Sequence, residues 1–158
     1  MKNFETPLAI TMGDPSGIGP EIILKSIIET RLNNFVIFGD SLVFESLIKS
    51  LGLPLTINKI SELSEAIFEE DYINLFETSK LNHLPHYGKI SKECGKVSFD
   101  AIMKSIEFAK QGKVSGIVTA PISKKALNLA LINYPGHTEI LAGYSNNKAV
   151  SMMLLNKH

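Results

Sequence analysis

Three segments combine residue types that favour binding of an anionic ligand, and each lies at the expected start of a helix. They span residues 13–21, 119–125 and 134–139. Glycine lets a ligand approach the backbone, and the first turn of a helix offers free N–H groups and the positive end of the helix dipole. Phosphate or carboxylate recognition is therefore the chemistry these segments suggest.

The first segment, Gly-Asp-Pro-Ser-Gly-Ile-Gly-Pro-Glu, follows an apolar run directly. Its glycines, at positions 13, 17 and 19, do not match the dinucleotide fingerprint, and it lacks the Lys-Ser/Thr pair of a P-loop. Two interpretations remain open: an anion-binding turn, or only a tight turn from strand to helix. Asp14 would contact a ligand in the first case and hydrogen-bond to its own turn in the second.

The other two segments contribute a lysine and a His-Thr pair. Lys124 follows a predicted strand end, where ligands gather in open α/β sheets, and is either an anion contact or a solvated side chain. His137 and Thr138 follow a Pro-Gly turn, and both side chains can donate hydrogen bonds to an oxyanion. The alternative is that Thr138 caps the helix and His137 lies on the surface.

Other reactive residues and the charge balance exclude several classes of function. His83 and His86 flank Pro85 with no third ligand nearby, so the sequence predicts no metal site there. Sixteen basic and sixteen acidic residues cancel, which indicates neither a nucleic-acid partner nor an anionic membrane. The single cysteine, Cys94, and the absence of a signal peptide or a long apolar run predict a cytoplasmic protein.

Apolar runs and helical stretches alternate along the chain, which predicts an α/β fold with a mostly parallel sheet. The position of the motif at Thr119 divides this fold into a first lobe over residues 1–118 and the start of a second lobe over 119–158. The predicted strands are 8–12, 35–38, 55–57, 72–76, 116–120 and the last apolar run, 150–154; the predicted helices start near 20 and span 41–49, 98–111, 123–131 and 138–144, with 61–70 loosely helical.

Taken together and in this order, residues 10–21, 118–124, 134–139 and 152–154 resemble the 4-hydroxythreonine-4-phosphate dehydrogenase family of vitamin B6 biosynthesis. The resemblance implies a two-lobed architecture like that of isocitrate and isopropylmalate dehydrogenases, truncated here, and a homodimer that shares its sites. It also implies NAD-dependent oxidation and decarboxylation of 4-phosphooxy-L-threonine, a phosphorylated amino acid, to 3-amino-2-oxopropyl phosphate. A divalent cation (zinc, magnesium or cobalt) would hold the substrate's hydroxyl and amino groups.

The resemblance assigns residues only in part. His137 and Thr138 match the family's substrate-binding pair, and Lys124 matches a lysine to which no chemical step is assigned. No catalytic or cofactor-binding residue is assigned in this chain. The metal-binding histidines lie beyond its end, and His158 does not fall at their position, so this chain is expected to hold no metal ligand.

Family members are considerably longer than this chain, so we expect the 158-residue chain to be inactive alone. Three alternatives stay open at this point. The first is a non-catalytic truncated remnant, and the second is a related dehydrogenase acting on another phosphorylated hydroxy acid. The third is a phosphate acyltransferase, against which the Gly-His-Thr-Glu motif argues.

Overall fold

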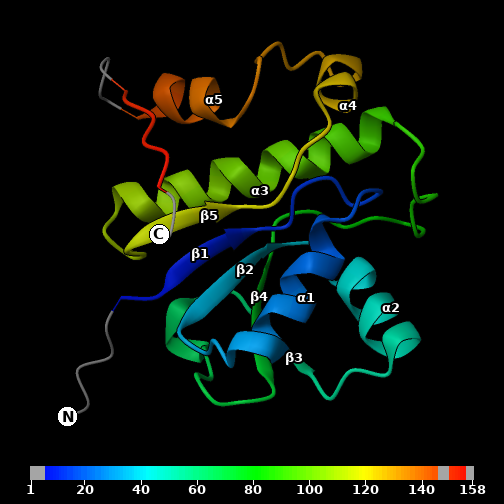
Figure 1. The fold of residues 1–158 in the computed structure, drawn as a ribbon, viewed down its shortest axis with the longest axis vertical. Coiled ribbons are helices and arrows are strands. Elements are labelled where there is room, and N and C mark those ends of the chain that lie inside the picture. The colour runs from blue at the N-terminus through cyan, green and yellow to red at the C-terminus, as the bar shows by residue number, and fades with distance from the viewer. Residues whose placement is uncertain (1–5, 146–149, 156–158) are drawn as a thin grey trace.

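The computed structural model describes residues 6–145 and 150–155 and contains one five-stranded sheet (Figure 1). All four neighbouring strand pairs are parallel. This arrangement confirms the predicted α/β fold class. In chain order the strands are β1 (Leu8–Thr11), β2 (Phe35–Gly39), β3 (Thr56–Ile60), β4 (Tyr72–Glu77) and β5 (Gly116–Thr119), and their order across the sheet is β3-β4-β2-β1-β5.

Helices cover both faces of the sheet, and a further layer lies outside one of them (Figure 1). Helices α1 and α2 pack on one face, α3 packs on the other, and α4 and α5 lie on the outer side of α3. None of these helices, within the ranges described, is long and apolar enough to cross a membrane. The helices are α1 (Gly19–Thr30), α2 (Ser41–Leu51), α3 (Lys92–Lys110), α4 (Lys124–Leu129) and α5 (His137–Tyr144), with a short 3-10 turn at Leu63–Glu65.

Strand β2, at the centre of the sheet, is apolar along its whole length because helices cover it on both sides. All five residues of β2 are buried. In β1, Ile10 belongs to the core under α1 and α2, whereas Ala9 belongs to the core under α3. This pattern is typical of parallel sheets, whose strands read as continuous apolar runs.

One predicted helix start is wrong. Helix α3 begins at Lys92 instead of near residue 98, because Ser91 caps it by accepting a hydrogen bond from the Cys94 N–H at 3.1 Å. Charged residues and a glycine in its first turns hide the apolar stripe. Helix α2 starts at residue 41, as predicted, and Asp40 caps it: the Asp40 carboxylate accepts from the Leu42 N–H at 3.0 Å.

Two other predictions on the regular structure need correction. Residues 150–155 form no strand, and their apolar side chains are exposed, from 51% at Val150 to 89% at Leu155. Of the stretch 61–70, only a single 3-10 turn is helical. His158 lies outside the described residues. Residue 119 ends β5, and the assignment of residues 119–158 to a second lobe stays a prediction.

Helices α3 and α4 approach each other so closely that one position of α3 requires glycine. A Cβ atom added at Gly95 would overlap the backbone carbonyl of Ala126 and lie 2.8 Å from the Leu127 nitrogen. Below this crossing, Ile102 and Ile106 of α3 pack with Leu127 of α4. The packing of α4 against α3 therefore requires a residue without a side chain at position 95.

Gly95→Ala should lower the free energy of unfolding by about 1–3 kcal/mol, because overpacking outweighs the better helix propensity of alanine. Gly116→Ala is the matched control, since a Cβ atom there meets only Leu8 at an ordinary 3.5 Å. Urea denaturation of both variants measures the difference. Equal stabilities would contradict the close crossing.

Candidate functional site

The candidate site lies beyond the carboxyl ends of β1 and β5, which are neighbours in the sheet. The chain leaves β1 toward α1 on one face, and it leaves β5 toward α4, on the side of α3 (Figure 1). Strands whose connections part in this way form the crevice in which open α/β sheets bind ligands. Two of the three segments singled out in the sequence, 13–21 and 119–125, meet at this crevice.

These two segments touch through their backbones, and the contact explains two of the glycines. Gly13 has a φ of 73°, and a Cβ atom there would overlap the Pro121 carbonyl oxygen. A Cβ atom at Gly19 would lie 3.1 Å from the Cβ atom of Ala120 in the second segment, and 2.7 Å from the Met12 carbonyl oxygen at the end of β1. The Asp14 N–H donates to the Pro121 carbonyl at 2.9 Å, so the segments are joined by a hydrogen bond as well.

The hydrogen bonds within the first segment favour a tight turn over an anion-binding turn. The Asp14 carboxylate accepts from both the N–H and the hydroxyl of Ser16, at 2.9 and 2.8 Å. The Gly17 N–H donates to the Asp14 carbonyl at 3.0 Å. Three amides that an anion would need are thus already used inside the protein, and a ligand contact by Asp14 stays a prediction.

The irregular stretch 78–91 and helix α3 hold the first segment from outside. The Gly88 N–H donates to the Ser16 carbonyl at 2.8 Å, and the Ser98 hydroxyl donates to the Gly13 carbonyl at 3.0 Å. His83 and His86 of this stretch are exposed. Among the described residues, no group of three His, Cys, Asp or Glu side chains is placed to hold a metal ion. The residues present therefore do not fit the cation that the family resemblance implies.

His137, the first residue of α5, lies half-buried against the end of β5. Burial lowers the pKa of its imidazole, and a hydrogen bond with the backbone of Ala120 opposes that effect only in part. Its Nε2 atom is buried and has no hydrogen-bond partner within residues 6–145 and 150–155. The alternative of a surface histidine is therefore wrong: the ring is held at the crevice with one nitrogen unused.

Thr138 does not cap α5. The cap position is Gly136, and no side chain accepts a capping hydrogen bond there. The Thr138 side chain lies partly exposed in the first turn. The capping role that the sequence left open for Thr138 is therefore wrong. Helix capping does not explain why a hydroxyl stands at this position.

Lys124 begins α4 and is exposed, while Ser123 caps that helix by accepting from the Ala126 N–H at 3.2 Å. None of the ion pairs between described residues involves this lysine. The connection between β5 and α4 thus begins with Ala120, which contacts His137, and leads directly to the exposed ammonium group of Lys124. Its role toward a ligand stays a prediction.

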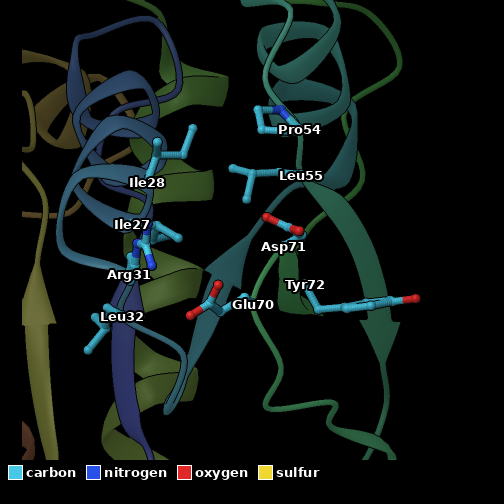
Figure 2. Close-up of a pocket in the computed structure, with 9 residues that line it drawn as sticks. All are labelled: Ile27, Ile28, Arg31, Leu32, Pro54, Leu55, Glu70, Asp71 and Tyr72. Atoms are coloured by element: carbon cyan, nitrogen blue, oxygen red, sulfur yellow. The ribbon is translucent and has the colours of Figure 1, made fainter.

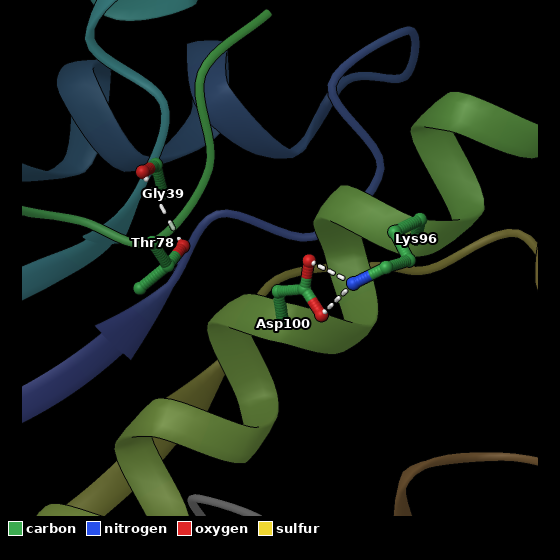
Figure 3. Close-up of polar contacts among 4 residues, drawn as sticks. All are labelled: Gly39, Thr78, Lys96 and Asp100. Atoms are coloured by element: carbon green, nitrogen blue, oxygen red, sulfur yellow. Dashed lines mark hydrogen bonds and ion pairs between the residues drawn. The ribbon is translucent and has the colours of Figure 1, made fainter.

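Sequence reasoning missed a buried carboxylate at the neighbouring strand ends. Asp40 follows β2, and burial together with the nearby charge of Glu77 raises the pKa of its carboxyl. It also accepts from the Leu81 N–H at 2.7 Å. Next to it, the Thr78 hydroxyl donates to the Gly39 carbonyl at 3.3 Å (Figure 3). These contacts anchor the stretch 78–91. The signal that could have identified Asp40 is its position between a predicted strand and a predicted helix, where an Asp commonly caps the helix.

A separate pocket lies at the opposite end of the strands, where β3 and β4 begin (Figure 2). Its volume is about 230 Å³, and Arg31, Glu70 and Asp71 are its charged lining residues. Ligand sites of open α/β sheets lie at the carboxyl ends instead. The three sequence segments contribute nothing to this pocket, and we do not assign it to the candidate site.

A parallel sheet with helices on both faces and polar loops at the β1–β5 crevice defines an open α/β protein, a class in which ligands bind beyond the carboxyl ends of the strands. The family model described as pyridoxal phosphate biosynthetic protein PdxA matches residues 31–158. The chain belongs to this family of dehydrogenases. This membership confirms the resemblance and removes the acyltransferase alternative.

Relatives and a solved structure agree with the family. A 4-hydroxythreonine-4-phosphate dehydrogenase from Beijerinckia indica is 46% identical over 157 residues, which cover 99% of this chain and 47% of that protein. A Fusobacterium nucleatum protein provisionally named D-threonate 4-phosphate dehydrogenase is 37% identical over 149 residues, which cover 92% of this chain and 45% of that protein. The crystal structure of a 4-hydroxythreonine-4-phosphate dehydrogenase from Burkholderia phymatum superposes with a TM-score of 0.86 at 32% identity, over 98% of this chain and 48% of that one. The chain thus spans about half the length of the curated relatives it matches.

The lowered pKa of His137 predicts how stability depends on pH. The unfolded chain, in which the imidazole keeps a pKa near its ordinary 6.5, takes up the proton more readily than the folded chain. The contribution of His137 is therefore complete above about pH 6.5 and is lost as the pH falls below it.

His137→Asn should flatten this dependence, so that the free energy of unfolding changes less between pH 7.5 and 5.5 than in the unmodified chain. Urea denaturation at both pH values is the measurement. His83→Asn, at an exposed histidine, serves as the control and should keep the original dependence. An unchanged slope in His137→Asn would show that its imidazole is not held neutral by burial.

Proposed function

We propose that the crevice between the β1 and β5 ends binds 4-phosphooxy-L-threonine, and that the chain contributes this half-site to an NAD-dependent dehydrogenase. The completed enzyme would oxidise the substrate's hydroxyl and release its carboxylate as carbon dioxide, giving 3-amino-2-oxopropyl phosphate. One observation carries the site: the Nε2 atom of His137 is buried and has no hydrogen-bond partner among the described residues. The 46% identity to a dehydrogenase of that name supports the substrate.

Three side chains at the crevice would contact the anionic groups of the substrate. His137 and Thr138 lie in the first turn of α5, where free N–H groups and the helix dipole favour the substrate's phosphate or carboxylate. An anion there would raise the pKa of His137 from its lowered value and favour a charge-assisted hydrogen bond. Lys124, exposed at the start of α4, would add a positive charge.

The rest of the proposed chemistry needs polypeptide that this chain lacks. No cluster of metal ligands exists among the described residues, so we assign the divalent cation and the remaining NAD contacts to the other half of the family sequence. A homodimer that shares its sites and a cytoplasmic location belong to the same proposal and rest on family membership alone.

A second substrate is favoured by a specific relative. The Fusobacterium protein is named for D-threonate 4-phosphate, which carries a hydroxyl where the threonine derivative carries an amino group. Its identity to this chain, 37%, is below the 46% of the Beijerinckia protein. We therefore place the amino acid first and a phosphorylated hydroxy acid second. A non-catalytic remnant remains the alternative in which neither is turned over.

In a chain completed with the second half of the Beijerinckia relative, His137→Asn should lower kcat/KM at least tenfold, on the order of 1.4 kcal/mol for a lost charge-assisted contact. Thr138→Ala should also lower kcat/KM while changing the free energy of unfolding by less than about 0.5 kcal/mol, because its hydroxyl does not cap α5.

Steady-state rates of NADH formation with both substrates are the measurement, and His83→Asn is the control that should leave the rates unchanged. Unaltered kinetics in His137→Asn would remove this residue from the substrate site. Turnover of the hydroxy acid alone would reverse the order of the two substrates.

The isolated 158-residue chain should form no NADH above background with either substrate, with zinc, magnesium or cobalt added. The reason is that the described residues offer no cluster of metal ligands. The completed protein, assayed in parallel, is the positive control. Turnover by the purified short chain would contradict the assignment of the metal site to the other half.

A further inference from the structure

The pocket where β3 and β4 begin lies at the opposite end of the strands from the candidate site (Figure 2). It is formed by the end of α1, the connection that leads into β3 and the residues just before β4. Its volume of about 230 Å³ is below the roughly 300–1,000 Å³ of sites for drug-sized ligands. A molecule that fills it is therefore small.

Arg31, the only arginine of the chain, stands at the end of α1 in an unfavourable backbone conformation. Its φ is 52°, in the left-handed region that glycine adopts freely and other residues disfavour. Helix α2 ends in the same conformation with Gly52, and it places its basic residue, Lys49, inside the last turn. A favourable contact with the helix dipole therefore needs no arginine at the left-handed position, and the side chain of Arg31 calls for another explanation.

Two carboxylates reach the same pocket from the segment before β4. Figure 2 shows Glu70 and Asp71 extending from this segment and Arg31 from the end of α1, with their charged groups toward the same space. None of the ion pairs between described residues involves any of the three. The pocket thus presents one cation and two carboxylates that do not neutralise one another by direct contact.

Asp71 shares the left-handed backbone of Arg31, with a φ of 69°. Its carbonyl accepts from the Thr56 N–H at 2.7 Å, which fixes the backbone beside the first residue of β3. Among the described residues, only one other non-glycine residue has a positive φ, Leu131, which is 81% exposed and does not line the pocket. Residues held in sparsely populated conformations gather at sites that clamp a ligand, and two of the three line this pocket.

The rest of the lining is mostly apolar and partly open to solvent. Ile27 is buried in the core, whereas Ile28 and Leu32 on the same side are 39% and 37% exposed. Leu55, from the connection before β3, is half-buried and packs against that core. An apolar group placed between these side chains would cover surface that water now reaches.

We propose that this pocket binds a free α-amino acid with an apolar side chain. The Arg31 guanidinium holds the carboxylate through paired N–H groups, and Glu70 and Asp71 accept hydrogen bonds from the ammonium group. The apolar side chain of the ligand covers Ile28 and Leu32. Two carboxylates disfavour a simple anion and the guanidinium disfavours a simple cation, so the complement is a molecule that carries both charges.

This inference does not rest on the proposed function, because the pocket and the crevice lie at opposite ends of the strands. The ligand would join α1, the connection before β3 and the start of β4, and a ligand that binds only the folded chain stabilises it. Leucine should therefore raise the melting temperature of the protein.

Isothermal titration calorimetry with L-leucine tests the proposal, both on the 158-residue chain and on the chain completed with the second half of the Beijerinckia relative. One site should be seen in each. Two analogues with the same apolar group are the ligand controls: 4-methylpentanoate lacks the ammonium group, and 3-methylbutylamine lacks the carboxylate. Each should bind at least tenfold more weakly than leucine, because it leaves a charge of the pocket unpaired.

Arg31→Gly should weaken leucine binding tenfold or more while changing the melting temperature of the free protein little, because glycine adopts the left-handed conformation without strain. Leu131→Gly is the matched control, since it relieves the same conformation outside the pocket, and it should bind leucine as the original chain does. Asp71→Asn, which keeps a residue that tolerates this conformation, should also weaken binding.

Equal binding of leucine by Arg31→Gly and the original chain would overturn the proposal. So would the absence of leucine binding in both forms of the protein. Binding of 4-methylpentanoate as tight as that of leucine would replace it by a simple anion site at Arg31. Loss of turnover in His137→Asn with leucine binding intact would affect only the proposed function.

Discussion

The backbone contact between the loops that follow β1 and β5 is the constraint on which the rest of the arrangement depends. The Asp14 N–H reaches the Pro121 carbonyl, and Gly13 leaves no room for a side chain between them. Because β1 and β5 send their connections to opposite faces of the sheet, this contact closes the base of the crevice. It also fixes Ala120, the residue against which His137 is held.

Helix α3 links this contact to the outer layer of helices. Its Ser98 hydroxyl bonds to the Gly13 carbonyl, and its Gly95 surface receives the backbone of α4. The same helix packs on the sheet through Ala101 and on α4 and α5 through Ile102. A change in α3 should therefore reach both the glycine-rich turn and the position of α5, since proteins are too tightly packed to absorb a shift locally.

The candidate site and an apolar groove meet at β5. Its carboxyl end leads into the connection that contains Ala120, which contacts His137, and Lys124. Beside it, an apolar groove runs between α1 and β5. The candidate site holds groups for an anion but, among the described residues, no metal cluster.

Much of the local structure could be predicted from the sequence, because periodicity and turn residues are local properties. The five strands of the sheet, the helix starts at α4 and α5, and the His-Thr segment were all identified from patterns of a few residues. The start of α3 was missed, because its first turns contain Gly95 and charged residues that hide the apolar stripe; only the Ser91 cap marked it.

Tertiary structure alone decided what depends on residues far apart in the chain. The glycines of 13–19 could serve anion binding or close packing, and the approach of residues 120–121, about a hundred positions away, accounts for the close packing at Gly13 and Gly19. The burial that lowers the pKa of His137 and the exposure of residues 150–155 are likewise properties of the assembled chain. Local composition specifies what each segment can form, whereas burial and close approach are set by which segments meet.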